Sequence, residues 1–110
     1  MSVNSQNTFT DEEIRDTSSH NGDVVFNGDF VIKTLVIENG LDQTVTLQCQ
    51  ASANSDFSNS FNVGSSFDVT ASTSTYQSCE TYFPYWRIVA QCSSAPTSGD
   101  LTIIIFGVEG

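Results

Sequence analysis

The sequence predicts an all-β protein, an antiparallel β-sandwich of the immunoglobulin-like or jelly-roll-like kind with about seven strands. Residues 44–51 and 85–92 alternate apolar and polar side chains with a period of two. This alternation is typical of strands with one buried face, because successive side chains of a strand point to opposite faces. Turn-forming sequences such as Asn39-Gly40 separate the alternating stretches. Ser, Thr, Asn and Gln dominate the polar residues, as in strands with solvated outer faces.

Residues 1–22 are predicted to be an extended N-terminal arm, and residues 23–110 the β-sandwich domain. The arm is polar and acidic, and Phe9 and Ile14 are among its few large apolar side chains. Thr10 to Glu13 match a capping box, so one or two helical turns are expected over residues 11–16. A helix this short is only marginally stable when nothing packs against it. We therefore expect a neighbouring subunit to hold the arm, and its deletion to leave a folded monomer that no longer assembles.

The strands of the sandwich follow in chain order. Two Asn-Gly-Asp turns, at 21–23 and 27–29, flank a short apolar segment. Residues 52–61 are expected to be a loop, and residues 72–78 a polar connection or an edge strand. Strands are expected at residues 24–26, 30–38, 44–51, 67–71, 85–92 and 101–106.

The last two strands are predicted to form a β-hairpin over residues 82–107, joined by a polar connection at 93–99. Pro96 and Gly99 in this connection favour a turn. The outward faces of this hairpin carry large apolar groups, so we expect a second sheet or a neighbouring subunit to cover them. Together with the two apolar residues of the arm, they form the candidate interface: Phe9, Ile14, Tyr85, Arg87, Val89, Ile104 and Phe106.

The chain carries a net charge of −10, with thirteen acidic residues against three basic ones. A phosphate backbone is bound by clustered Lys and Arg, so direct binding to nucleic acid or to an anionic membrane is not expected. The acidity fits either solubility through self-repulsion or a high-salt habitat. The N-terminus has neither the basic end nor the apolar run of a secretory signal, and we expect synthesis in the cytoplasm.

The three cysteines are Cys49, Cys79 and Cys92. No Cys-x-x-Cys sequence or Cys/His pair is present, so no zinc site is predicted. Cys49 and Cys92 fall on the apolar faces of predicted strands, where they would form either an inter-sheet disulfide or two buried thiols.

No metal, cofactor or catalytic residue is predicted. The oxygen donors at the Asn-Gly-Asp turns match no calcium-binding loop and are ordinary turn residues: Asn21, Asp23, Asn27 and Asp29. The single histidine, His20, lies in the polar arm, with no nucleophile identified beside it. The sequence therefore argues against an enzyme.

An aromatic cluster surrounds Pro84 and includes Tyr82, Tyr85 and Trp86. Exposed aromatic rings bind sugars by stacking. An alternative function is therefore a carbohydrate-binding or adhesion module that uses the Tyr82–Trp86 cluster. Alternatively, Trp86 and one tyrosine belong to the core and the other rings cover the end of a sheet.

Two stretches of the sequence, LVIENG–LDQTVTLQCQAS and FPYWRIVAQCSSAPTSGDLTIIIFG, carry a resemblance to a known family. They resemble small β-sandwich structural proteins of the virions of tailed viruses that infect bacteria and archaea. The resemblance covers residues 36–107, and the three cysteines depart from the family pattern. It implies a capsid decoration, turret or head–tail connector protein, located in the virion and without catalytic residues. Its expected partners are further copies of the chain and other capsid or connector proteins, and an acidic version suits viruses of halophilic archaea.

Overall fold

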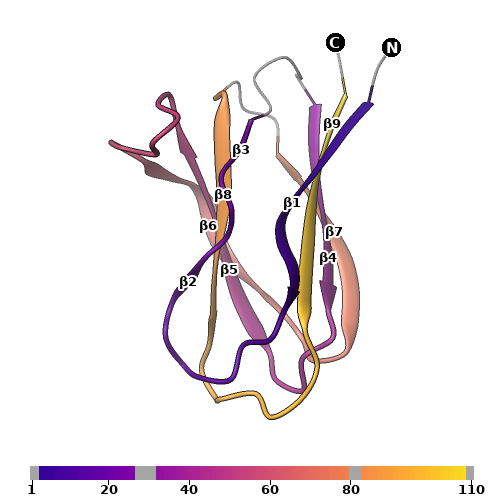
Figure 1. The fold of residues 1–110 in the computed structure, drawn as a ribbon. Coiled ribbons are helices and arrows are strands. Elements are labelled where there is room, and N and C mark those ends of the chain that lie inside the picture. Colours follow the sequence, from indigo (N-terminus) through magenta and orange to yellow (C-terminus); the bar gives the residue numbers. More distant parts are fainter. Residues whose placement is uncertain (1–2, 27–31, 80–82, 109–110) are drawn as a thin grey trace.

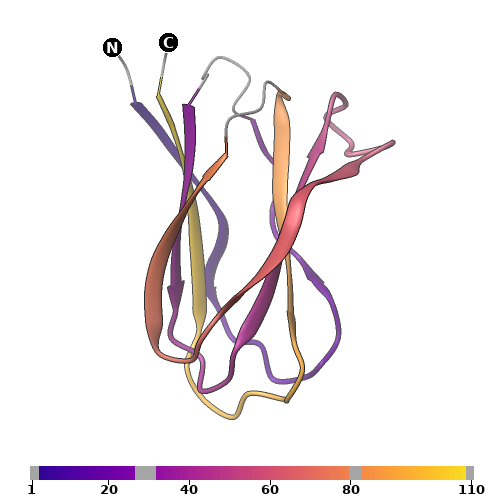
Figure 2. The same ribbon diagram turned by 180° about the vertical axis from the view of Figure 1, so that it is seen from behind.

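The computed structural model describes residues 3–26, 32–79 and 83–108. These residues form two antiparallel sheets packed face to face, so the predicted all-β sandwich is confirmed (Figures 1 and 2). The four-stranded sheet A has the order β1-β9-β4-β7, and the five-stranded sheet B has the order β2-β8-β5-β6, with β3 also paired to β8. The strands described are β1 (Val3–Glu12), β2 (His20–Asn21), β3 (Val25–Phe26), β4 (Ile32–Asn39), β5 (Val45–Ser52), β6 (Phe61–Val69), β7 (Thr73–Cys79), β8 (Tyr85–Cys92) and β9 (Leu101–Val108).

The core lies between the two sheets and follows the alternation of the sequence. Every second residue of β5 and β8 is buried against its counterparts from β4 and β9. The largest of these side chains, Trp86, is 1 % exposed. Burying an apolar side chain of this kind stabilises the fold by roughly 1.5–3 kcal/mol. The predicted inward faces of these strands are thus confirmed.

The N-terminal segment is part of the sandwich, which corrects the expectation of a separate arm. Strand β1 pairs with β9 from Val3 opposite Val108 to Glu12 opposite Leu101. Phe9 and Ile14 are only 4 % and 1 % exposed and belong to the core. The expected helical turns over 11–16 do not form. The edge of β9 offers backbone partners and the core offers an apolar site, both of which an isolated helical turn lacks.

The predicted hairpin of the last two strands is wrong. β8 pairs with β5, β2 and β3 in sheet B, whereas β9 pairs with β1 and β4 in sheet A. The connection at 93–100 therefore crosses from one sheet to the other, at the bottom of Figure 1. Packed sheets lie only about 10 Å apart, which a connection of this length spans easily. Alternation determines which side chains are buried, but it does not determine which strand lies beside which.

The crossing connection is tied to the β4–β5 turn by Asp42. The Asp42 carboxylate accepts hydrogen bonds from the Thr97 hydroxyl and, at 2.9 Å, from the Thr97 backbone N–H. These hydrogen bonds lower the pKa of Asp42 below its ordinary value. The two loops at this end of the sandwich are thereby held together by an ionised carboxylate.

We expect this bond to make the protein sensitive to acid. A carboxyl group whose pKa is lower in the folded state stabilises the fold above its unfolded pKa of about 3.9, and this stabilisation is lost as the pH falls through the folded value. The loss of unfolding free energy between pH 7 and pH 3, measured with urea, should therefore be smaller in Asp42→Asn than in the wild type. Thr97→Val, which removes the hydroxyl donor, should also reduce it, and equal losses in all three proteins would contradict the assignment.

Cys49 and Cys92 lie on neighbouring strands of the same sheet, so the predicted alternative of an inter-sheet disulfide is wrong. Cys49 is opposite Ile88, and Cys92 is opposite Val45. The two pairs are four residues apart along each strand. Four residues of a strand span roughly 13 Å, about twice the separation of Cα atoms that a disulfide bridges. Burial, and secondarily the charge of Asp16, raises the pKa of the Cys92 thiol, which keeps it neutral.

Candidate functional site

The seven candidate interface residues do not form one surface. Phe9 and Ile14 are buried in the core of their own chain. The other five are half-buried on the outer faces of the sandwich, but on opposite sides of it. The β8 residues Tyr85, Arg87 and Val89 lie outside sheet B, and the β9 residues Ile104 and Phe106 lie outside sheet A. The expectation that a hairpin would present these five residues on its outward faces as one surface is therefore wrong.

The outer face of sheet A carries a contiguous row of apolar side chains. Ile104 of β9 is opposite Val36 of β4, and Val36 is opposite Tyr76 of β7. Phe106 lies two residues from Ile104 and points to the same face. Opposed side chains of an antiparallel pair are about 5 Å apart, so these groups are in reach of one another. We call Val36, Tyr76, Ile104 and Phe106 the sheet-A row.

Tyr76 is the most accessible member of the sheet-A row. Its side chain is 72 % exposed, whereas the other three members are half-buried. Contiguous exposed apolar groups mark candidate contact surfaces, so the sheet-A row is the candidate contact surface of this face. No local pattern of the sequence indicates Val36 and Tyr76 as contact residues, because their place in the row depends on β4 lying between β9 and β7.

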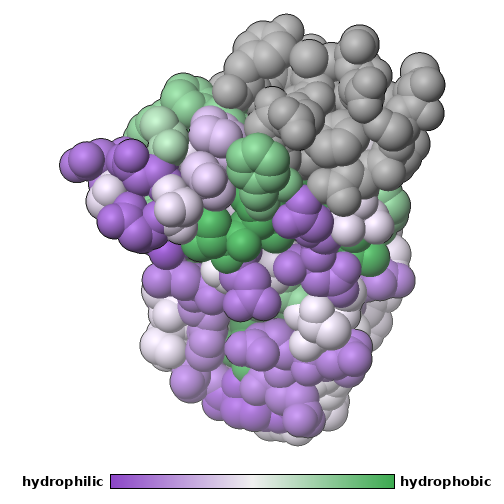
Figure 3. All heavy atoms as spheres, turned by 45° about the horizontal axis from the view of Figure 1, so that its top comes forward, coloured by the Kyte–Doolittle hydropathy of each residue, from purple (hydrophilic) through white to green (hydrophobic). Residues whose placement is uncertain are grey.

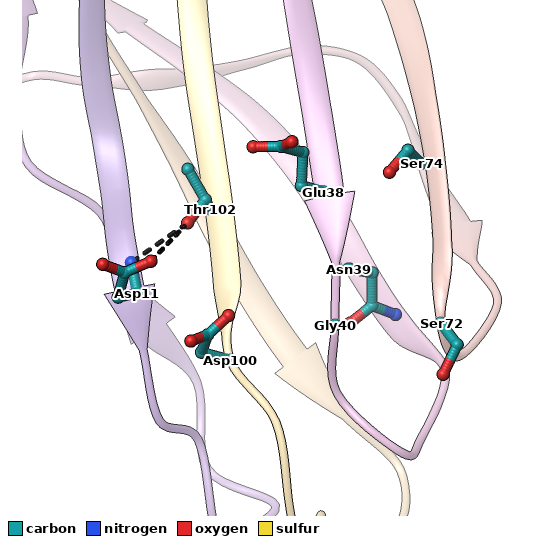
Figure 4. Close-up of a pocket in the computed structure, with 8 residues that line it drawn as sticks. All are labelled: Asp11, Glu38, Asn39, Gly40, Ser72, Ser74, Asp100 and Thr102. Atoms are coloured by element: carbon teal, nitrogen blue, oxygen red, sulfur yellow. Dashed lines mark hydrogen bonds between the residues drawn. The ribbon is translucent and has the colours of Figure 1, made fainter.

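A polar hollow of about 340 Å³ adjoins the sheet-A row (Figure 4). Glu38, Thr102 and Ser74 in its wall lie two residues along their strands from three members of the row. The full lining is Asp11, Glu38, Asn39, Gly40, Ser72, Ser74, Asp100 and Thr102. None of these side chains is basic, so the hollow is acidic and suits a ligand that donates hydrogen bonds.

The carboxylates of the hollow come from three different segments of the chain. Asp11 lies beside Thr102. The Thr102 hydroxyl accepts a hydrogen bond from the Asp11 backbone N–H at 3.0 Å and donates one to the Asp11 carboxylate at 3.3 Å. The buried Asn39 amide is used within the fold, because its nitrogen donates to the Gln43, Val69 and Thr70 carbonyl groups. Within the described ranges, no three His, Cys, Asp or Glu side chains are grouped so that they could hold a metal ion.

On the outer face of sheet B, Arg87 and Tyr85 contact other side chains of the same chain. The Arg87 guanidinium lies 4.4 Å from the centre of the Phe57 ring, and its Nε donates to Gln50 Oε1 at 2.9 Å. The Phe26 and Tyr85 rings are 5.4 Å apart at the same end of the sheet. Figure 3 shows the apolar side chains that gather at this end of the molecule. Two of the three candidate interface residues of sheet B, Tyr85 and Arg87, thus already contact side chains of their own chain.

The stacking platform expected from the Tyr82–Trp86 cluster is not present as predicted. Trp86 faces the core, is 1 % exposed and donates its indole N–H to the Phe83 carbonyl oxygen at 2.6 Å. Phe83 packs edge-to-face on Phe61 with ring centres 4.5 Å apart. Tyr82 lies outside the described residues. The expectation that Trp86 belongs to the core is therefore confirmed, whereas Tyr85 is half-buried on the outer face of sheet B.

The single histidine lies in a small polar cluster with Asp16 and Ser18. His20 Nε2 is 2.7 Å from Asp16 Oδ1, and the Ser18 hydroxyl donates to the same oxygen at 2.9 Å. A Ser-His-Asp relay needs the carboxylate on one ring nitrogen and the hydroxyl on the other. Here both neighbours contact Nε2, at 3.4 Å in the case of Ser18. The His20 and Ser18 hydrogen bonds lower the pKa of Asp16, and the cluster closes the turn before β2.

The four oxygen donors at the Asn-Gly-Asp turns are of the kind that calcium prefers. Asn21 and Asp23 lie in and just after β2, whereas Asn27 and Asp29 are outside the described residues. The described part of the chain has no helix of the length and apolar character needed to cross a bilayer.

Comparison with known proteins yields a likeness of fold alone. No protein-family model matches the chain, and no curated protein matches it. The crystal structure of PirA superimposes on it with a TM-score of 0.54 at 16 % sequence identity, over 96 % of this chain and 91 % of that one. At this identity the likeness extends to the sandwich architecture, and the function has to be argued from the surface.

Proposed function

We propose that this protein is a structural subunit that docks on a neighbouring protein of a larger assembly through the outer face of sheet A. The sheet-A row is the observation that carries the proposal. The resemblance to virion proteins suggests the kind of assembly, a capsid carrying decoration or turret proteins or a head–tail connector. The contribution of such a subunit is mechanical, made through contact area rather than through chemistry.

The row supplies the apolar centre of a contact surface, and the residues around it supply a polar rim. Thr34, Ser78 and Ser5 border the row on their strands, and the acidic hollow lies at its other end. Interfaces between proteins have this arrangement, with aromatic and aliphatic anchors inside a hydrogen-bonding border. The Tyr76 ring is 72 % exposed, so covering it would supply much of the apolar area that the contact buries.

The charge around the hollow points to a partner of different sequence. The carboxylates of Asp11, Glu38 and Asp100 line it without a basic neighbour. Two of the three basic residues of the chain are already engaged, because Arg15 bonds Glu13 at 3.3 Å and Arg87 bonds Gln50 at 2.9 Å. The partner would therefore present apolar side chains beside a Lys or Arg that enters the hollow.

The proposal can be tested in a lysate of the native source by density-gradient sedimentation, with the chain followed by an antibody. We expect the wild type in a fast-sedimenting assembly. Ile104→Lys should shift most of the chain to the slow fractions, because it places a charge in the apolar centre of the contact. Val89→Lys is the matched control, since Val89 is equally half-buried but lies outside sheet B.

Two results would overturn the proposal. The first is a wild-type chain that sediments entirely as free protein. The second is an Ile104→Lys variant, folded by circular dichroism, that remains in the assembly as fully as Val89→Lys does. The carbohydrate-binding alternative has lost its central residue because Trp86 is buried, and no contact in the structure favours it over docking.

A further inference from the structure

Strand β7 is an unusually regular edge of sheet A, on the right in Figure 1. It pairs with β4 over seven consecutive positions, from Asn39 opposite Thr73 to Lys33 opposite Cys79, without a register shift. Within the part of the chain that the structure describes, no strand pairs with its other side. Alternate N–H and C=O groups along this side therefore lack a strand partner, as at any sheet edge.

The other edges of the sandwich carry the features by which proteins prevent edge-to-edge pairing. β1 has two register shifts and an Asp11 with a left-handed φ of 46°. β6 has a register shift against β5, a charged Asp68 and Gly64 with a φ of 70°. β2 and β3 are two residues long each. Bulges, charges and short length all block the addition of a strand.

β7 has none of these protections. Its sequence, TSTYQSC, contains no charged residue and no proline. This is unexpected in a chain with a net charge of −10. Charged side chains on an edge strand are one of the main barriers to pairing, so their absence from this long and regular edge is a feature to be explained.

We propose that β7 pairs antiparallel with β7 of a second copy of this chain, joining the two sheets A into one continuous sheet. Two copies of the same edge strand can pair antiparallel when a twofold axis relates them, because such an axis brings the same surface of both copies together. In such a pair, the central residue lies opposite its own copy, and every other residue lies opposite the residue equally far from the centre on the other side. Like charges at two such positions would therefore face each other. Pairing that uses all seven residues is centred on Tyr76, so Tyr76 meets its own counterpart and Ser74 meets Ser78.

The exposed ring of Tyr76 supports the second copy as the occupant. Tyr76 is 72 % exposed and lies at the end of the sheet-A row, next to the free edge. In the dimer the two rings form a cross-strand aromatic pair, a favourable combination in antiparallel sheets. The sheet-A rows of the two copies then join into one apolar band across the axis. The inference does not depend on the proposed docking partner, because it rests on the edge and not on the face.

The test uses the full chain and its mass in solution, measured by light scattering and analytical ultracentrifugation over a concentration series. The wild type should reach the mass of two chains. Ser74→Lys with Ser78→Lys places like charges opposite each other at two positions, and the dissociation constant should rise about tenfold or more. Ser74→Lys with Ser78→Glu instead pairs opposite charges across the axis and should restore the dimer.

Matched controls separate this pairing from a general effect of charge. Ser65→Lys with Ser66→Lys adds the same two charges to exposed positions of the β6 edge and should leave the dimer unchanged. All four serines are exposed, so the variants should fold, and urea unfolding checks this. The proposal is overturned if the wild type is monomeric throughout, if the double lysine variant dimerises like the wild type, or if the Lys/Glu variant stays monomeric. Each of these results leaves the sedimentation test of Ile104 unaffected.

Discussion

Deleting residues 1–12 is expected to prevent the chain from folding, the opposite of what a separate arm predicts. The deletion removes β1 and leaves one side of β9 without its partner strand. It also removes Phe9 from the core and the buried Thr8 hydroxyl, which donates to the Asp23 carbonyl oxygen at 2.9 Å. Replacing a buried Phe by Ala costs about 3–5 kcal/mol. Domains of this kind have total stabilities of only about 5–15 kcal/mol.

The deletion is checked by far-ultraviolet circular dichroism and by the loss of a cooperative thermal transition. Since a protein that fails to fold also fails to express, Phe9→Ala in the full chain provides a second measurement. Urea unfolding should show a loss of about 3–5 kcal/mol for this variant. Removal of residues 1–2 alone should leave the transition in place. A deletion variant that unfolds cooperatively at the wild-type temperature would show that β1 is dispensable.

Gly99→Ala is expected to destabilise the protein strongly through the backbone of the crossing connection. Gly99 has a left-handed φ of 86°, which an alanine adopts only with strain. A Cβ atom on Gly99 would lie 1.9 Å from the Gly40 carbonyl oxygen. The backbone of Gly40 cannot easily yield, because its N–H donates to the Asp100 carbonyl oxygen at 2.8 Å. The β4–β5 turn and the β8–β9 connection would have to separate, and with them one end of the sandwich.

Gly64→Ala is the matched control for this effect. Gly64 also has a positive φ, 70°, but a Cβ atom placed there has nothing within 4 Å. A residue held in a sparsely populated backbone conformation costs about 1–3 kcal/mol, and Gly64→Ala should lose no more than this in urea unfolding. Gly99→Ala should lose clearly more, since the contact with Gly40 is added to the same strain. Equal losses in the two variants would mean that the close approach of the loops contributes nothing to stability.

Much of the fold could be predicted from local patterns in the sequence. The alternation along residues 45–52 and 85–92 identifies strands and their buried sides, because a strand buried on one face must alternate. It also placed Trp86 on the inward side of its strand, although the neighbouring aromatic residues suggested a binding platform. The sequence does not indicate that the N-terminal segment belongs to the sandwich, because β1 is polar at all but a few positions. Its outer face needs no apolar residues, and its inner face contributes little besides Phe9 to the core.

The candidate site could be predicted only in part. Ile104 and Phe106 were identified from the sequence as apolar residues on an outward face, and they belong to the sheet-A row. A hairpin would place Tyr85, Arg87 and Val89 on the same face, but the crossing at 93–100 places them on the other side of the molecule. The acidic hollow combines residues from four strands or turns far apart in the chain. No local pattern could indicate it.

Local sequence patterns are enough to predict the all-β class and the buried sides of the main strands, and the composition gives the net charge of −10. The strand order, the place of β1 inside the sandwich and the common face of Val36, Tyr76 and Ile104 become visible only in the folded chain. The physical reason is that burial imposes a period along each strand, which any local stretch displays. The choice of neighbouring strand depends on the combined packing of both sheets and on the reach of the loops, to which every segment contributes at once.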